Sequence, residues 1–397
     1  MDEFSGVQKF SLDLTKFIVA RGHRAILISR RDSASPVSVV IFGPPEQSSR
    51  KFAPDPLTKR QLSTNPIHTL LFFVFATLAM IRICRRHRVS IIHTQDIFFS
   101  GFAGAIAHKL FEIPLIVHAH GPSPYFSEAT SEATKLRRIL MKRLAKVVMR
   151  KSSLIIATDI HTKNLLSPSV DKARVMCMPI PIDTRIYSKE RGIRTRISRT
   201  PNESLILGFI GRLSPQKNLR RLLSAFASAR ASLNEKLRLV IVGNGPESSF
   251  LVREAGRLRL HKHIIFTGTV SENKKVELLN SFDIFLMPSL YEGCPIALLE
   301  AMASGKTIIA SDIPSIREIV RHGEEAILVN PYDVEELEQA ILLLYNDPDL
   351  RAKLGRNARE RAKLYNVDRV YGLMLKVYEE LIHRKGKMKY ATVKKFS

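Results

Sequence analysis

Short apolar runs alternate with longer amphipathic stretches along the whole chain. The runs are five to seven residues long and rich in Val, Ile and Leu. Such runs, separated by helical stretches, indicate parallel strands that helices bury on both faces. The expected strands are 25–29, 37–42, 90–94, 115–120, 154–158 and 174–179 in the first half, and 205–211, 237–243, 263–268, 283–288, 307–311 and 326–330 in the second. The pattern predicts an α/β protein with two doubly wound parallel sheets.

A polar, basic segment with Gly and Pro, residues 188–204, divides the two halves and is typical of a linker. The length of 397 residues also favours two domains over one core. We therefore expect a first domain at 1–187 and a second at 205–365. A helix at 366–383 is expected to cross back to the first domain, and a basic tail follows at 384–397.

The start of the chain departs from the usual doubly wound order. A Ser5–Gly6 loop leads directly into an expected helix, Val7–Arg21, whereas a central strand normally precedes that first turn. The first strand is thus expected to be absent or to lie upstream of Met1. The opening residues hold two acids and no apolar core, so no secretory signal is expected there.

The only long apolar run, Ile67–Cys84, is at the lower limit of a membrane span and is interrupted by His68, Thr69 and Thr77. A basic stretch and an expected strand follow it at once. A buried helix packed before a parallel strand is the favoured interpretation, with membrane insertion as the alternative.

Basic residues greatly outnumber acidic ones. Lys and Arg total 62 against 37 Asp and Glu, a net charge of +25. Nucleic acid, an anionic membrane and phosphate-bearing substrates are all suitable partners. Residues 133–158 hold eight basic residues and no acid, and 135–151 has apolar side chains at helical spacing. This helix is either packed with a solvated basic face, or docked on an anionic bilayer, or bound to nucleic acid.

The three cysteines, Cys84, Cys177 and Cys294, are far apart and have no metal-ligand spacing, which indicates a reducing compartment. A cytoplasmic location is expected, at the inner face of the membrane if 135–151 docks there.

Phosphate-binding chemistry is suggested by the turns after three strands of the second half. The stretch GFIGRLSPQKNL places Arg212 and Lys217 on the loop that follows Gly211. A planar guanidinium and a point-charge ammonium suit a diphosphate, although a pair of solvated loop cations is the alternative. Gly243 and Gly268 end the next two strands and allow a ligand to approach the backbone closely.

The stretch YEGCPIALLEAMASGK holds Glu292 and Glu300, eight positions apart. On one helix that spacing means about 80° of rotation and roughly 12 Å of rise, so the two carboxylates cannot grip one atom. A helix is expected with Pro295 as its first residue, which aims backbone N–H groups at an anion. Glu292 then lies in the loop and Glu300 farther along, near another part of the ligand. A capping acid and a surface glutamate are the alternative.

Other candidates are weaker. His120 ends an expected strand and is followed by Gly121 and Pro122, so it is a candidate site residue. His118 is expected on the other face of that strand and is taken as structural, as is His93. The pair Asp347 and Asp349 is interpreted as a helix start and not as a metal site.

Taken together, these motifs resemble the GT4-type (group 1) retaining glycosyltransferases, which have the GT-B fold. The matching stretches are GRLSPQKNL, VGNGPE, FTG, MPSLYEGCPIALLEAMASGK, ASDIPSIREIV and ILVNPYDVEEL, with looser likeness in SIIHTQD and IPLIVHAHGPSPYF. The resemblance implies two Rossmann-like domains facing across a cleft, the first binding the acceptor and the second a nucleotide sugar.

The resemblance also implies roles for individual residues. Arg212 and Lys217 would bind the donor diphosphate and stabilise it as a leaving group, and Glu300 would hold the ribose. Glu292 would contact the donor sugar, and His120 would lie near the sugar and the acceptor. The implied catalytic set is His120, Glu292, Arg212 and Lys217, and the implied donor site is Gly6, Gly211, Arg212, Lys217, Gly243, Gly268, Glu292, Gly293, Cys294, Pro295 and Glu300.

The implied activity is metal-independent, retaining transfer of a hexosyl unit from a nucleotide-diphosphate sugar to a glycan or lipid-linked acceptor, without a cofactor. A role in cell-envelope or glycolipid biosynthesis follows from such an acceptor. An epimerase-like enzyme that converts the nucleotide sugar alone is one alternative. A basic nucleic-acid-binding protein is another, but the chain lacks aromatic platforms or a recognised reading motif, so no nucleic-acid partner is expected.

Overall fold

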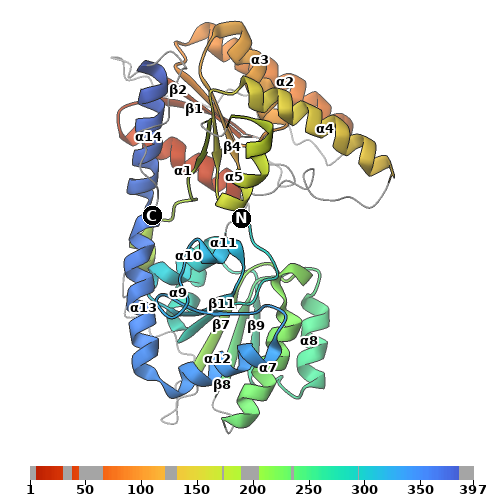
Figure 1. Ribbon diagram of the computed structural model, residues 1–397, viewed down its shortest axis with the longest axis vertical. Helices are drawn as coiled ribbons and strands as arrows, with labels where there is room; N and C mark the ends of the chain where they lie inside the picture. Colours follow the sequence, from red (N-terminus) through yellow and green to blue (C-terminus); the bar gives the residue numbers. More distant parts are fainter. Residues whose placement is uncertain are drawn as a thin grey trace. The chain divides into compact units, whose positions relative to one another are not determined.

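The computed structural model describes residues 6–29, 38–43, 66–120, 132–171, 174–188, 205–233, 237–293 and 295–383 (Figure 1). The chain forms two compact units. The first contains Met1–Ile180 and Val370–Ser397, and the second contains Pro181–Arg369. The expected linker from residue 189 onward and the basic tail lie outside the described residues.

The first unit is built on a six-stranded sheet in the order β1-β2-β3-β4-β5-β6. From β3 to β6 all pairs are parallel, whereas β1 pairs antiparallel with β2, and β2 with β3. Parallel pairing throughout was expected. Only eight residues, 30–37, connect β1 to β2, which is too short for the crossover that a parallel pair needs. The strands are β1 (Arg24–Ser29), β2 (Ser38–Gly43), β3 (Ile91–Thr94), β4 (Leu115–Ala119), β5 (Leu154–Ala157) and β6 (Val175–Cys177).

Helices cover both faces of this sheet. On one face α2 (Pro66–Arg86), α3 (Phe99–Phe111) and α4 (Glu132–Lys151) pack around buried side chains such as Met80 and Val148. On the other face, Phe10 of α1 (Gly6–Ala20) contacts Tyr371 of α14 (Val367–His383). A short helix, α5 (Ile160–Leu166), packs against β5 and β6. From Val370 onward α14 is therefore part of the first unit, although it follows the second in sequence.

The helix α2 is not buried on all sides, contrary to expectation. Val74, Phe75 and Leu78 are 45%, 63% and 56% exposed, while Met80 on the opposite side is fully buried. The apolar run thus forms a helix that buries one face and exposes apolar side chains on the other. Among the described residues, no helix is both long and apolar enough to span a bilayer.

The second unit has a six-stranded, wholly parallel sheet in the order β12-β11-β10-β7-β8-β9. Its two faces carry separate hydrophobic cores. Residues 207 and 209 of β7 face one core, with α7, α8 and α12, while residues 206 and 210 face the other, with α10 and α13. The strands are β7 (Leu205–Ile210), β8 (Leu237–Val242), β9 (Ile264–Gly268), β10 (Ile284–Met287), β11 (Thr307–Ser311) and β12 (Ile327–Val329). The helices are α6 (Thr184–Ser188), α7 (Leu219–Ser232), α8 (Ser248–Arg257), α9 (Glu272–Ser281), α10 (Ile296–Ala303), α11 (Pro314–Arg317), α12 (Val334–Asn346) and α13 (Pro348–Ala362).

Every expected strand occurs, each within two residues of its expected bounds. The α/β class with two Rossmann-like units, and parallel strands at the core of each, is confirmed. The helix α6 groups with the second unit, whereas the sequence placed residues up to 187 in the first domain. The reason is packing, because Ile182 and Tyr187 are buried in the core that α10 and α13 share.

Candidate functional site

The candidate residues of the second unit gather at the carboxyl edge of its sheet. The strands β7 and β10 are neighbours, and the chain leaves them toward opposite faces, with α7 in one core and α10 in the other. A position where the strand order reverses in this way is where open α/β sheets bind ligands. Arg212 and Lys217 follow β7, and Glu292 follows β10.

Three glycines bring the turns after β7, β8 and β9 close together. The N–H of Gly243 donates to the carbonyl of Gly268 at 2.9 Å, and the N–H of Gly211 donates to Val242 O at 3.0 Å. A Cβ on Gly243 would lie 1.9 Å from the carbonyl oxygen of Gly211, and Gly243 has φ of +128°. Only glycine allows these backbones to approach so closely. The three turns therefore meet at this edge of the sheet through backbone atoms, without a Cβ at Gly211, Gly243 or Gly268.

The loops after β7 and β10 are joined by hydrogen bonds. Leu290 N donates to the carbonyl of Gln216 at 2.8 Å, and the Gln216 side chain donates to Tyr291 O at 2.7 Å. Next to these bonds, Lys217 Nζ pairs with Glu292 Oε1 at 2.6 Å. The Glu292 side chain is 6% exposed and that of Lys217 is 18% exposed. The sequence analysis gave these two residues separate ligand contacts, and the structure brings them into one ion pair.

The remaining candidate residues belong to the same two loops. Arg212 follows Gly211 directly, and its side chain is exposed. Gly293 follows Glu292, and Cys294 lies outside the described residues. Pro295 was expected to be the first residue of α10, but it is the N-cap of that helix. Its φ is near that of proline in a helix, but its ψ of 75° is not helical. Glu292 is therefore not a capping residue of this helix.

Glu300, in the second turn of α10, is buried and holds two donors. Its Oε1 accepts from the hydroxyl of Tyr187 and from Nζ of Lys275, each at 2.7 Å. Burial lowers the pKa of Lys275, but the carboxylates of Glu300 and Glu272 outweigh it, so the pKa is raised overall. Burial first, and then Glu300, raises the pKa of the Tyr187 hydroxyl, which stays protonated. Sequence reasoning missed both partners, because α6 and α9 reach Glu300 only in the folded unit.

In the first unit, His120 belongs to a stack of three imidazoles. Its ring lies 4.2 Å from that of His118, and His118 lies 5.4 Å from His93. His118 was expected to point away from His120, but that expectation was wrong, because residues two apart on a strand share a face. Burial lowers the pKa of His120 and of His93 to about 3, so both rings are neutral at pH 7.

The neighbours of this stack come from three elements. His120 Nε2 lies 2.8 Å from Gln95 Oε1, just after β3, and His93 Nδ1 lies 2.5 Å from the hydroxyl of Tyr378 on α14. Phe10 of α1 packs edge-on against His118 and His120. Gly6, the other candidate of this unit, begins α1 and is not in a loop. Gln95 was not singled out from the sequence, because a lone amide after a strand carries no signal.

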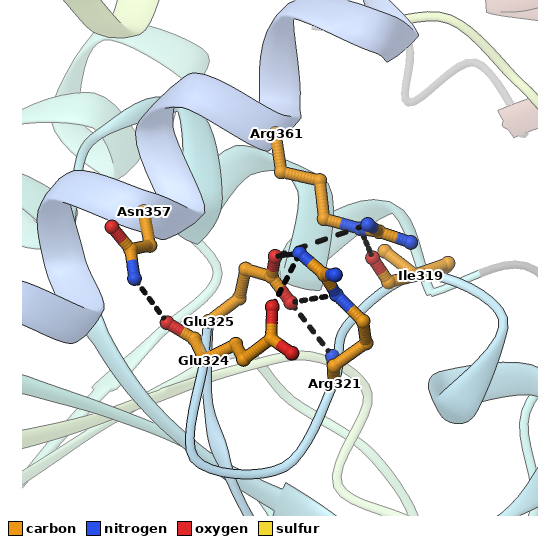
Figure 2. A network of polar contacts seen from close by, with 6 residues as sticks. All are labelled: Ile319, Arg321, Glu324, Glu325, Asn357 and Arg361. Carbon is orange, nitrogen blue, oxygen red and sulfur yellow. Dashed lines mark hydrogen bonds and ion pairs between the residues drawn. The ribbon is translucent and has the colours of Figure 1, made fainter. Parts of the chain in front are cut away.

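Two further charged groups of the second unit have structural roles. Asp347 caps α13 by accepting from Leu350 N at 2.8 Å, as the interpretation of a helix start predicted. Figure 2 shows a second cluster, in which the buried carboxylate of Glu325 accepts from Arg321 and lies 3.8 Å from Arg361. Arg361 also donates to the carbonyl of Ile319. This cluster ties α13 to the turn before β12.

Known proteins match this chain in both units. The family described as "Glycosyl transferases group 1" matches residues 192–361, and "Glycosyltransferase Family 4" matches residues 4–186. The chain is 30% identical to an MMP alpha-(1→4)-mannosyltransferase of Mycolicibacterium hassiacum, over 76% of this chain and 72% of that protein. It is 24% identical to an alpha-monoglucosyldiacylglycerol synthase of Streptococcus pneumoniae, over 68% and 62% of the two chains. Its fold is similar to that of HepE from Anabaena, solved in complex with UDP, with a TM-score of 0.65, 20% identity, and coverage of 79% and 82%.

Proposed function

This chain belongs to the group 1 glycosyltransferases and has their GT-B fold; from that premise we propose a donor, an acceptor and a mechanism. The donor is a nucleotide-diphosphate sugar, and the product is a hexosyl unit on a glycan or lipid-linked acceptor. The observation that carries the proposal is the joining of the Lys217 loop and the Glu292 loop at the switch point of the second sheet. UDP in HepE and the lipid product of the S. pneumoniae synthase support the two substrate classes.

The proposed donor site uses each group for one part of the nucleotide sugar. The diphosphate lies against Arg212, Lys217 and the bare backbone at Gly211, Gly243 and Gly268. Glu300 accepts from the ribose hydroxyls. Glu292 faces the sugar, with Gly293 and Pro295, which precede α10, beside it. Lys217 then bridges the phosphate and Glu292, because an ammonium group can donate three hydrogen bonds.

The proposed chemistry is electrostatic. Breaking the glycosyl–phosphate bond leaves negative charge on the diphosphate and positive charge on the sugar. Two fixed cations stabilise the first, and the Glu292 carboxylate stabilises the second, without a metal ion. The acceptor hydroxyl attacks the anomeric carbon from the same face from which the diphosphate leaves, which retains the configuration, and its proton passes to the departing phosphate oxygen. His120 stays neutral at pH 7 and would hydrogen-bond the sugar or the acceptor as an uncharged ring.

A panel of UDP-, GDP- and ADP-sugars tests the donor assignment by thermal stabilisation. Nucleotide sugars with one of the three bases should stabilise the protein. Lys217→Met should weaken binding of that donor about tenfold or more, because a charge-assisted contact to phosphate is lost. Lys262→Met is the matched control, since Lys262 is exposed and precedes β9 at the other edge of the sheet. Stabilisation by no donor, or equal loss in both variants, would contradict the assignment. The anomeric configuration of the product, measured by NMR, tests retention.

The first unit carries an outer surface that fits an anionic bilayer. Over the described side chains of α4, Ile139 and 141–151, the exposed residues fall on one stripe, with two apolar side chains, Ile139 and Val147, among cations and no acid. On α2 the exposed Val74, Phe75 and Leu78 lead into exposed arginines at its end. Both helices contact α3 on the same face of the sheet. Exposed cations among the described side chains of the two helices are Arg82, Arg85, Arg86, Lys142, Arg143, Lys146, Arg150 and Lys151. Such an apolar and basic surface would hold the enzyme at a lipid-linked acceptor.

Vesicle flotation tests this membrane contact. The full chain should float with vesicles that contain phosphatidylglycerol and not with pure phosphatidylcholine. The double change Lys142→Glu and Lys146→Glu should lower binding at least tenfold, since each cation near the surface contributes about 1 kcal/mol. The same changes at Lys262 and Lys274, which are exposed in the second unit, give a matched control. Binding that is equal for neutral vesicles, or lost equally in the control, would remove the bilayer from the proposal.

A further inference from the structure

The two carboxylate oxygens of Glu300 have different surroundings. Oε1 accepts two hydrogen bonds, from Tyr187 and Lys275. Oε2 accepts no hydrogen bond from the described residues and is not fully buried. The side chain as a whole is only 6% exposed. One oxygen is therefore anchored by two donors, and the other is left without a hydrogen bond from the described residues.

The two anchors come from separate elements and are themselves held in place. Tyr187 is on α6 and is 5% exposed, and Lys275 is on α9 with its side chain 15% exposed. Lys275 also pairs with Glu272 at 3.1 Å, one turn earlier on the same helix. The helix α9 starts where Ser271 accepts from Lys274 N, directly after β9 and its Gly268 turn. The anchor is thus built into the edge where the donor is proposed to lie.

We propose that Tyr187 and Lys275 are positioning residues that fix the Glu300 carboxylate, so that Oε2 alone accepts from the ribose hydroxyls of a nucleoside diphosphate. The inference rests on the proposed role of Glu300 in donor binding. Without the two donors, the carboxylate would rotate about its last torsion, and a buried acid would lose its counter-charge. The pair of anchors makes the ribose contact rigid, and a rigid acceptor binds a diol more tightly than a mobile one.

The sugar ring of the nucleotide gives a direct readout. Each of UDP, GDP and ADP is titrated against its 2′-deoxy analogue by calorimetry with the full chain. The wild type should bind the ribonucleotide of its preferred base about ten- to a hundredfold more tightly than the deoxynucleotide, because a hydrogen bond to a charged group is lost. In Lys275→Met this ratio should fall to below about threefold, mainly through weaker binding of the ribonucleotide. Tyr187→Phe, which keeps the ring, should reduce the ratio by a smaller factor.

Lys274→Met is the matched control. Lys274 is the neighbouring lysine on α9, is 50% exposed and pairs with Glu277. It should keep the wild-type ratio. A general loss of packing would weaken both nucleotides equally and leave the ratio unchanged, so the ratio separates positioning from stability.

Glu300→Gln separates the two levels of the proposal. Suppose that this variant loses the preference for the ribonucleotide over its 2′-deoxy analogue, while Lys275→Met and Tyr187→Phe both keep it. Glu300 then binds the ribose unaided, and the positioning inference is overturned. If Glu300→Gln itself keeps the wild-type ratio, or no nucleoside diphosphate binds to the wild type, the proposed donor site is wrong and the inference falls with it.

Discussion

At the scale of single residues, Gly243 makes possible the close approach of strands at the proposed donor site. Its φ of +128° and the position of the Gly211 carbonyl leave no room for a side chain. The strands β7 and β8 can end side by side only because neither turn carries a Cβ there. The N–H groups of Gly211 and Gly243 are used in bonds to Val242 O and Gly268 O, so these glycines bring the three turns together.

Gly243→Ala should therefore destabilise the second unit by about 2 kcal/mol or more, because the backbone must leave a conformation that an L side chain rarely adopts. Urea unfolding measures the change. Gly256→Ala in α8 is the control, since a Cβ there would meet nothing within 4 Å. It should raise stability by roughly 0.5–1 kcal/mol, as alanine does in a helix. A Gly243 variant as stable as the wild type would show that the turn tolerates a side chain.

The stacked histidines make the first unit sensitive to acid. Burial lowers the pKa of His93 and His120 to about 3 and that of His118 far below 6.5, whereas the unfolded rings titrate near 6.5. Between these values the unfolded chain binds more protons, so the contribution to stability is complete above about pH 6.5 and falls as the pH drops toward 3. Burial raises the pKa of Asp96, which acts in the opposite direction. The nearby phenols of Tyr371 and Tyr378 do not titrate in this range.

His118→Phe should reduce this loss of stability between pH 7.5 and pH 5. The unfolded chain then has one imidazole fewer to protonate, while a buried aromatic ring is kept. Urea unfolding at the two pH values measures it. His161→Phe is matched, since His161 is exposed on α5 and should leave the acid sensitivity as it is. Equal acid sensitivity in all three proteins would refute the explanation.

At the scale of elements, one buried carboxylate joins a helix to a turn. Glu325 is 3% exposed in its side chain and binds the backbone and guanidinium of Arg321, next to Arg361 of α13 (Figure 2). Burial raises the pKa of this carboxylate, but the bonds from Arg321 outweigh it and the pKa is lowered overall. The charge therefore favours the folded state above the ordinary pKa of Glu, and that contribution is lost as the pH falls through the lowered value.

Glu325→Gln should cost roughly 2 kcal/mol at pH 7, since hydrogen bonds to a buried charge are weakened. Glu324→Gln provides the comparison, because Glu324 pairs with the same arginine but is 53% exposed. Its loss should change stability by less than about 0.5 kcal/mol. Chemical unfolding measures the free energy of unfolding of both variants. Similar losses for the two would mean that burial of Glu325 does not explain its contribution to stability.

At the scale of the whole molecule, the first unit is discontinuous in sequence. Its second segment begins at Val370, and α14 buries Tyr371, Met374, Val377, Tyr378 and Leu381. Tyr378 reaches His93 on β3, and Tyr371 reaches the carbonyl of Phe10 on α1. The first unit is therefore complete only after the second has been synthesised.

A chain that ends at Arg369 should unfold in its first unit and keep the second. Removing each large buried side chain costs about 3 kcal/mol or more, and together these losses exceed the ordinary stability of a domain. Hydrogen exchange should show lost protection in β3 and β4 and retained protection in β7 and β8. A chain that ends at His383 is the control and should keep both. Protection of β3 in the shorter chain would show that α14 is dispensable.

The sequence by itself determined the strands, the two-unit α/β class and the residues of the proposed donor site. Apolar runs of strand length can be buried only between helices, and glycine, cation and carboxylate motifs lie next to one another along the chain. The tertiary structure decided what depends on pairing between distant segments. It placed β2 antiparallel between β1 and β3, exposed one face of α2, and brought Tyr187 and Lys275 to one oxygen of Glu300. Those contacts join residues as far as 113 positions apart, and no local pattern encodes a partner at that distance.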